Sequence, residues 1–373
     1  MDLTAQAVFA AGRTSPVPGG GHRTEATLEQ PLMLSHARLA GGALRVDLAI
    51  NLEGLTMPAG VPGLGAWGEG YVDRRHPHTY LHELMVSVAH GMSPGLRVSA
   101  AAGKGFVAFG TDDPMNRPAL RFPVNHHWAQ VLERAVIQGA VRVERVALEG
   151  SLFNGDEPER PAQWPNLSRL GDSWSGRLTV WPGMGVKAQV SHARVASPEH
   201  RGGAGPRADK WSASASFSRT AAPGSVYLLA EWARTSEAGG FFVFDSWLGE
   251  VEAVRAPHRV YLRGERTRRP EESRTLNLTR TVRPHVDDAL LGITRWSVGT
   301  VGYGATVALP TVPLTVEPLM EVSLARAETL TGVFSVEDFY GRTSFGSVTL
   351  GLRVRHGPAH VMGRYGVMRD VEH

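Results

Sequence analysis

The sequence predicts an all-β protein, a closed antiparallel transmembrane β-barrel of about 16 strands, within a range of about 14–18. Three observations lead to this fold class. Apolar and polar residues alternate along many segments, the segments are about as long as a tilted strand that crosses a bilayer, and short turns alternate with long polar loops. Long extracellular loops combined with short periplasmic turns are typical of outer-membrane barrels. We therefore expect residues 1–373 to form a single barrel domain.

The clearest alternation covers residues 43–53, and a helix would mix its apolar and charged residues on shared faces. The apolar positions of this segment are Leu44, Val46, Leu48, Ile50 and Leu52. Residues 211–218 and 347–355 repeat the pattern, and weaker examples occupy 146–152, 174–180, 186–191, 226–233, 259–265 and 320–325. Roughly 17 segments qualify as strands, the last of them His360–Val367, and an even number near 16 is expected for a single bacterial chain.

Glycine and proline mark the connections between these segments. Long polar stretches lie at 13–30, 54–78, 110–127, 155–172, 198–209, 267–287 and 328–344, and tight turns lie at 41–42, 93–95, 182–185, 222–224 and 256–258. A soluble sandwich would also alternate, but its strands would be nearer five or six residues long. A soluble all-β ligand-binding protein therefore remains the competing class, and it would shield the apolar face of residues 43–53 with a second sheet.

Composition excludes several classes of protein. The chain has no cysteine, so it can form no disulfide, no cysteine-based zinc site and no thiol nucleophile. No stretch of 18 apolar residues is present, which excludes a helical membrane span. The net charge of +3 is too small to indicate a nucleic-acid partner. No export signal precedes the first predicted strand, so an outer-membrane location requires that the signal peptide was already removed.

Histidines raise the question of a metal site. His76, His78, His82 and Glu83 lie close together in the sequence, and imidazole and carboxylate groups are zinc or copper ligands. Pro77 interrupts any regular spacing, and His82 and Glu83 would point to opposite faces of a strand. We therefore predict solvated loop histidines, no metal and no cofactor.

No enzyme is predicted either. The Gly-X-Ser-X-Gly pattern is absent, and the glycine-rich stretch Gly299–Gly304 lies inside a strand pattern with no helix after it.

Aromatic residues are expected at the two membrane interfaces, because amphipathic rings favour that position. The residues at or near predicted strand ends are Trp174, Trp181, Trp211, Trp232, Trp247, Trp296, Phe241, Phe242, Phe244 and Tyr261. The alternative is that they fill a soluble core.

Two stretches add a resemblance to a known family. Residues 103–110, 111–118 and 122–134, continuing to 148–156, together with the ending Met362–Val367, resemble bacterial outer-membrane porin-type proteins. The resemblance covers about a fifth of the chain and implies a loop near 110–127 that folds into the barrel and narrows it. In this family the last residue is usually phenylalanine. The ending Met368–His373 departs from that, which raises the question of a cloning remnant.

The loop 110–127 is dense in charge and is our candidate pore constriction. Fixed charges in a narrow aqueous pore act through a reduced dielectric and select ions. The constriction residues are Asp112, Asp113, Arg117, Arg121, His126 and His127, with Glu133 and Arg134 just after the loop. An ordinary surface loop braced by Asp–Arg pairs is the alternative.

The polar faces of the strands should line the lumen. The predicted lining residues include Arg45, Asp47, Arg177, Lys187, Glu231, Arg263, Arg353 and Arg364. These observations favour a porin with a water-filled channel for passive diffusion of small hydrophilic solutes or ions, weakly preferring anions. The expected partners are the outer-membrane bilayer, its lipopolysaccharide and the solutes, and a homotrimer stays open. A barrel whose lumen is plugged, and which serves structure or assembly, is the alternative within the fold.

Overall fold

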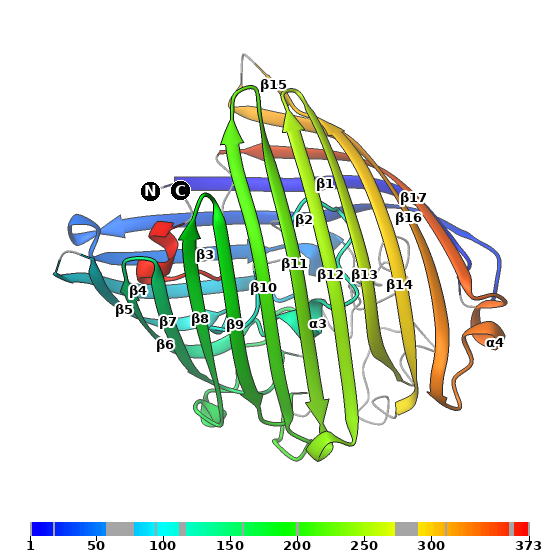
Figure 1. The fold of residues 1–373 in the computed structure, drawn as a ribbon, viewed down its shortest axis with the longest axis horizontal. Helices are drawn as coiled ribbons and strands as arrows, with labels where there is room; N and C mark the ends of the chain where they lie inside the picture. Colours follow the sequence, from blue (N-terminus) through cyan, green and yellow to red (C-terminus); the bar gives the residue numbers. More distant parts are fainter. Residues whose placement is uncertain are drawn as a thin grey trace.

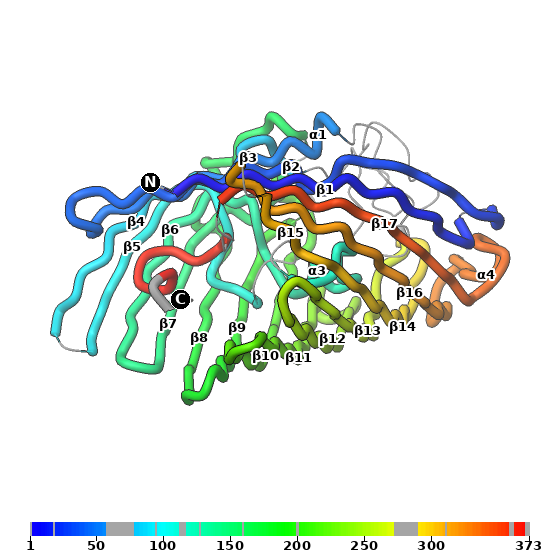
Figure 2. Tube along the Cα trace, turned by 90° about the horizontal axis from the view of Figure 1, so that it is seen from above, coloured from blue at the N-terminus to red at the C-terminus, as the bar shows by residue number. Residues whose placement is uncertain are grey.

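The computed structural model describes residues 2–17, 19–56, 78–93, 95–111, 117–158, 160–198, 201–272, 290–309, 312–357 and 362–371. These residues form one closed antiparallel sheet, in which β1 (Asp2–Ser15) pairs with both β2 (Arg23–Leu39) and β17 (Ser344–His356) (Figure 1). Figure 2 shows the closure from above, with β1 and β17 on one side and β10–β13 on the opposite side. The fold class predicted from the sequence is confirmed.

Each of the other strands pairs with its neighbours in chain order. Within the described ranges the barrel has 16 long strands, and the short β15 (Val307–Ala308) pairs only with β16. The remaining strands are β3 (Leu44–Asn51), β4 (Leu81–Ser93), β5 (Leu96–Gly105), β6 (Arg134–Val143), β7 (Val146–Phe153), β8 (Ser173–Gly183), β9 (Val186–Val195), β10 (Ala208–Ala221), β11 (Gly224–Glu237), β12 (Phe242–Arg255), β13 (His258–Glu272), β14 (Leu290–Ala305) and β16 (Leu314–Gly332).

The two faces of the sheet differ as the alternation predicts. In β3, Arg45 and Asp47 are buried inside the barrel, whereas Leu44, Val46 and Leu48 lie on the outer face. Elsewhere on the outer face large apolar side chains are exposed, for example Leu148, Leu324 and Leu350. The described residues contain one sheet, so no second sheet shields the apolar face, as the soluble sandwich would require.

Short helical pieces occupy some connections. They are η1 (Ala40–Gly42), α1 (Glu53–Thr56), α3 (His126–Ala129), η3 (Leu167–Arg169), η4 (Ala238–Gly240), α4 (Val336–Tyr340) and η7 (Gly366–Val371). In the described part of the chain, no helix is long and apolar enough to cross a membrane.

The ends of several strands differ from the prediction. The expected loop 13–30 is shorter, because β1 continues to Ser15 and β2 begins at Arg23. β13 and β16 likewise extend into the expected loops 267–287 and 328–344. The polar residues at these ends look like loop in the sequence, yet they still pair with a neighbouring strand. The five predicted tight turns do lie at the end opposite the long loops.

The predicted last strand, His360–Val367, is wrong. Residues 358–361 lie outside the described residues, and the described residues after them, 362–371, form no strand but contain the helical turn η7. β17 already closes the barrel by pairing with β1, which leaves no sheet edge for a further strand. Residues 362–371, which we call the C-terminal segment, lie beside β4, β5 and β6 (Figure 2).

The aromatic residues divide between the two faces. Trp174, Trp211 and Trp247 are exposed on the outer face, as expected for interfacial rings. The same expectation is wrong for Trp296, Phe244 and Tyr261, which are buried inside. Trp296 lies against Tyr340 and Phe345, with ring centroids 6.1 Å and 4.8 Å away.

Candidate pore and the segments inside it

The connection from β5 to β6 follows the inner wall of the barrel. Its described parts, 106–111 and 117–133, are here called the inserted segment. Apolar side chains of this segment pack against opposite sides of the barrel: Leu120 packs with Val8 of β1 and Leu319 of β16, while Trp128 packs with Ala233 of β11 and Phe244 of β12. The segment therefore touches both sides of the lumen.

Carboxylates of the wall accept hydrogen bonds from the main chain of the inserted segment. Glu321 of β16 accepts from the backbone nitrogens of Leu120 at 2.8 Å and Arg121 at 3.3 Å. Glu265 of β13 accepts from the backbone nitrogen of Val124 at 2.6 Å. Buried N–H groups need such partners, so the acidic residues of the wall fix the course of this chain.

Arginines of the wall donate hydrogen bonds to backbone carbonyls of the same inserted segment. Arg259 Nη1 donates to the carbonyl of Pro118 at 3.1 Å, and Arg177 Nη1 donates to that of Gly110 at 3.3 Å. Arg263 donates to the carbonyl of Arg121. Charged side chains of the wall thus bind both the N–H and the C=O groups of the inserted segment. Such charge-assisted hydrogen bonds are stronger than hydrogen bonds between neutral groups.

Arg117 is the most deeply engaged of the predicted constriction residues. Its Nη2 lies 2.8 Å from Glu231 Oε2, and its Nη1 lies 3.8 Å from Glu250 Oε1. Asn125 Nδ2 donates to the other oxygen of Glu231 at 2.7 Å. Burial alone would lower the pKa of Arg117, but Glu231 and Glu250 raise it above its ordinary value. Arg117 is therefore a charged anchor between the segment and the strands β11 and β12.

The other predicted constriction residues have different surroundings. Arg121 is buried among Glu265, Glu321 and Arg263, and its burial lowers the pKa of this guanidinium. His126 is buried with its ring 5.6 Å from that of Phe122. Asp112 and Asp113 lie outside the described residues, and the side chain of His127 is likewise not described.

Glu133 and Arg134 close the segment where β6 begins. Glu133 accepts hydrogen bonds from the backbone nitrogen of Thr79 at 3.1 Å and its hydroxyl at 2.6 Å, and it lies 2.6 Å from His82 Nδ1. Lys104 Nζ is 3.7 Å away. Arg134 donates to the carbonyl of Leu132 and pairs with Glu157, both at 2.8 Å.

The contacts of the Glu133 carboxylate with Thr79, His82 and Lys104 should be sensitive to acid, because they depend on its negative charge. Burial would raise the pKa of Glu133, but the charge and hydrogen bond of His82, with Lys104, lower it from 4.5 to about 2. A lowered pKa stabilises the folded state above about pH 4.5, and this stabilisation is lost as the pH falls toward 2. We expect Glu133→Gln to lower the melting temperature in detergent at pH 7 and to have little effect at pH 2. An equal effect at both pH values would contradict this.

The prediction of solvated loop histidines is wrong for those that the structure describes. His78 and His82 are buried, and His78 Nδ1 lies 2.7 Å from Glu53 Oε2. Glu83 is also buried, because the register shift between Ala49 and Ile50 leaves His82 as an extra residue in β4, and this bulge lets His82 and Glu83 both point inward. His76 lies outside the described residues. Among the residues that are described, no group of three or more potential ligands could hold a metal ion.

The C-terminal segment fills another part of the lumen. The Tyr365 hydroxyl donates to Glu83 Oε2 at 2.8 Å and accepts from the backbone nitrogen of Phe106 at 3.0 Å, so it links the two inner segments. Glu83 also accepts from the Gly363 nitrogen at 3.2 Å. Arg45 donates to the carbonyl of Gly366 at 3.0 Å. Burial and the nearby Glu83 raise the pKa of Tyr365 well above its ordinary value, so it remains a donor at any ordinary pH.

Most of the predicted lining residues are buried inside the barrel, where they contact other parts of the protein. Asp47 pairs with Arg369, and Arg364 lies 3.9 Å from Glu149 Oε2. Arg364 reaches the lumen from the C-terminal segment and not from a strand, which corrects our assignment. Arg353 pairs with Glu317 at 2.9 Å, and Lys187 is half-buried. The remaining lining residues, Arg45, Arg177, Glu231 and Arg263, hold the two inner segments as described above.

Sequence reasoning missed the residues that organise the C-terminal segment. Glu83, Tyr365 and Arg369 are buried and form the contacts given above, but none of them was singled out as part of the pore. For the C-terminal segment, the signal in the sequence was the presence of Arg364, Tyr365 and Arg369 after the last true strand.

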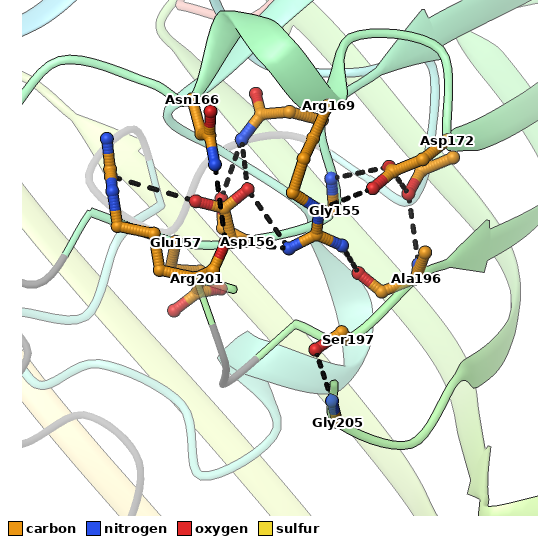
Figure 3. Close-up of polar contacts among 12 residues, drawn as sticks. Gly155, Asp156, Glu157, Asn166, Arg169, Asp172, Ala196, Ser197, Arg201 and Gly205 are labelled. Atoms are coloured by element: carbon orange, nitrogen blue, oxygen red, sulfur yellow. Dashed lines mark hydrogen bonds and ion pairs between the residues drawn. The ribbon is translucent and has the colours of Figure 1, made fainter. Parts of the chain in front are cut away.

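The long loop between β7 and β8 is bound to the long loop between β9 and β10. Arg169, in the loop between β7 and β8, pairs with Asp172 at 2.7 Å and donates to the carbonyl of Ala196 at 2.6 Å (Figure 3). Asp156 lies between Arg169 and Arg201, at 3.3 Å and 3.7 Å. The loops that follow β7 and β9 are therefore fixed to one another.

Comparisons with known proteins agree with this architecture. No protein-family model matches the chain, and a search of the curated proteins finds no match. Among solved structures, the anion-selective porin from Comamonas acidovorans is similar, with 11% identity, a TM-score of 0.51, and coverage of 95% of this chain and 98% of that one. OprB from Pseudomonas putida has 12% identity and a TM-score of 0.52, covering 96% and 94%. OmpF from Salmonella typhi has 9% identity and a TM-score of 0.51, covering 94% and 97%. The chain resembles outer-membrane porins in fold.

Proposed function

We propose that this chain is an outer-membrane porin-type channel for passive diffusion of small hydrophilic solutes or ions. One observation carries the proposal: a closed 16-stranded barrel has a charged inner face and an apolar outer face. A barrel with about 16 strands is wide enough for an aqueous channel, and an apolar outer band suits lipid. The bilayer and the lipopolysaccharide of the outer membrane are then its surroundings, and a homotrimer is one assembly compatible with the fold.

Within that channel, we assign the constriction to the inserted segment. Arg117, Arg121 and His126 belong to this segment, and its hydrogen bonds to Glu321 and Glu265 keep it inside the barrel. A segment that lies against both sides of the lumen is well placed to set the narrowest point of a passage. Glu133 and Arg134 fix its return to the wall.

A second candidate is a plugged barrel that anchors or assembles other components. The observation that favours it is the burial of both the inserted segment and the C-terminal segment. Tyr365 joins them through Phe106, so the two segments support each other inside the lumen. This candidate shares the fold and the location of the first but predicts no steady passage of ions.

Purified full-length chain in planar bilayers separates the two functions. The porin-type channel is expected to give stepwise conductance, and the plugged barrel none at any voltage. The same sample should migrate differently on a gel before and after boiling, as closed barrels do. A chain that is soluble without detergent and migrates identically in both states would contradict both candidates.

The ion preference is expected to be weak and toward anions. Arg117 and Arg121 lie in the inserted segment, and screening over about 8 Å at physiological salt leaves the choice to charges at the narrowest point. The anion-selective Comamonas porin offers a precedent for such a preference on this fold. The pairing of Arg117 with Glu231 reduces its effect, which is why we expect the preference to be small.

Reversal of these two charges tests the assignment. Arg117→Glu with Arg121→Glu places new carboxylates beside Glu231, Glu250 and Glu321, so the reversal potential in a salt gradient should move toward cations. Arg326→Glu, on the outer face, serves as the control and should leave it unchanged. An unchanged reversal potential in the double variant would mean that these arginines do not line the constriction.

A further inference from the structure

The C-terminal segment, residues 362–371, lies against the inner wall of the barrel and follows the last strand, β17 (Figure 2). The barrel closes through β1 and β17, so no strand depends on where this segment lies. Every residue from Met362 to Arg369 is nevertheless buried. The wall therefore encloses the segment as a binding site encloses a ligand.

Glu83 of β4 receives its hydrogen bonds from this segment. Its Oε2 accepts from the Tyr365 hydroxyl at 2.8 Å and from the Gly363 nitrogen at 3.2 Å. Among the residues that the structure describes, no residue of the wall donates to Glu83. A buried carboxyl group needs hydrogen-bond donors, and here they come from outside the sheet. Glu83 is thus placed to bind a ligand and does not brace the strands.

The main chain of the segment is bound as well. Arg45 of β3 donates to the carbonyl of Gly366 at 3.0 Å. Ser99 Oγ on β5 accepts from the backbone nitrogen of Val367 at 3.2 Å. With the Gly363 nitrogen, the wall binds peptide N–H and C=O groups at three positions, which is a pattern that suits a peptide ligand.

The two arginines of the segment meet acidic residues of the wall. Arg364 Nη1 lies 3.9 Å from Glu149 Oε2 on β7, and Arg369 pairs with Asp47 on β3. Arg364 also donates to Gln189 Oε1 at 3.4 Å. The wall therefore accepts positive charge at two separate places.

Small residues of the wall leave room for the apolar side chains of the segment. Val367 and Met368 pack with Ala140 of β6 and Ala147 of β7. Larger inward residues at these two positions would take the space that the segment fills. The site thus combines room for apolar side chains with partners for the backbone, for a phenol and for guanidinium groups.

We propose that this part of the wall is a binding site for short peptides in which arginine precedes tyrosine, and that the C-terminal segment occupies it as an internal ligand. The inference rests on the proposed channel, which such peptides would enter as small hydrophilic solutes. A segment tethered near its site has an effective concentration on the order of millimolar. A free peptide therefore competes only weakly in the native chain and binds well once the segment has left.

Gly363→Pro with Gly366→Val should release the segment while every residue of the wall stays native. Proline lacks the N–H that Glu83 accepts and cannot adopt the φ of +75° found at Gly363. A Cβ at Gly366 would lie 2.3 Å from Ser99 Oγ, so valine does not fit there. In planar bilayers this full-length variant should conduct severalfold more than the native chain.

A matched control replaces two glycines that have open space around them. Gly139→Val with Gly299→Val adds side chains where no atom lies within 4 Å of the new Cβ. This control should conduct like the native chain.

A synthetic peptide with the sequence of residues 362–371 is the probe for the vacated site. It should return the conductance of the Gly363 and Gly366 variant to the native level. A scrambled peptide of the same composition should need about a hundredfold higher concentration, because it loses the hydrogen bonds to charged groups. The native chain should not respond at the concentration that blocks the variant, since its site is already occupied.

Equal block by the two peptides, or no block by either, would overturn the inference. If the variant does not insert, the chain truncated after Gly357 supplies the vacant site for the same comparison. Conduction that ignores the native peptide would leave the proposed channel standing without a peptide site. If no preparation conducts, the proposed function fails, and native mass spectrometry of the variant in detergent decides the site by whether it binds the native peptide in preference to the scrambled one.

Discussion

Truncation after Gly357 is expected to raise the conductance of the barrel severalfold. The C-terminal segment then no longer occupies the space beside β4, β5 and β6. Its partners Arg45, Asp47 and Glu83 belong to the wall and would be exposed to water, which tolerates charge on the inner face of a wide barrel. The barrel itself should persist, because β1 and β17 pair without this segment.

Single-channel recordings would measure this change. A chain that ends at Val371 keeps the C-terminal segment and is the matched control, so it should conduct like the full-length protein. The result also separates the two candidate functions. A silent full-length chain that conducts only after truncation indicates a plugged barrel, and a conducting chain that becomes wider indicates a narrowed porin. Equal conductance before and after truncation would show that the segment does not restrict the passage.

Glu231→Ala is expected to release the inserted segment from the wall. Glu231 accepts from Arg117 at 2.8 Å and Asn125 at 2.7 Å, and its loss leaves the Arg117 guanidinium buried with less compensation. Removing one partner of a buried ion pair costs about 3–5 kcal/mol. Hydrogen exchange of the amides of Leu120, Arg121 and Val124 should therefore accelerate by about a hundredfold or more.

A double variant and an external control sharpen this test. Arg117→Met together with Glu231→Ala removes both charges, so much of the protection should return, because an apolar pair can replace a buried ion pair. Glu328→Ala removes an exposed carboxylate on the outer face and should leave these amides unchanged. If the single variant exchanges as slowly as the native protein, the pair does not hold the segment in place.

The parts of the fold that depend on local pattern could be predicted from the sequence. A period of two assigns Arg45 and Asp47 to the inside because neighbouring residues of a strand face opposite ways. The glycine and proline turns were located for the same reason, since backbone conformation there is set by the residues themselves. The expectation of a charged loop after the fifth strand rested on its composition and on the resemblance to porin-type proteins.

The parts that depend on distant pairing could not be predicted. Tyr365 and Val367 favour a strand locally, but whether a strand can form there depends on whether β17 and β1 have already met. The bulge beside Glu83 arises from register with β3, which no local pattern reveals. The carboxylate partners of Arg117, Glu231 and Glu250, are likewise more than a hundred residues away in the chain.

The wall holds the inserted segment by its backbone at Pro118, Leu120, Arg121 and Val124. The support of the segment is therefore separate from the contact that its side chains make with a solute. A hydrogen bond to a peptide group is indifferent to the side chain attached, so these positions can vary while the segment keeps its course. Pro118 and Pro123 stand where no N–H is used by the wall, whereas proline at 120, 121 or 124 would remove a donor. Evolution could thus exchange the side chains that meet a solute without redesigning the support beneath them.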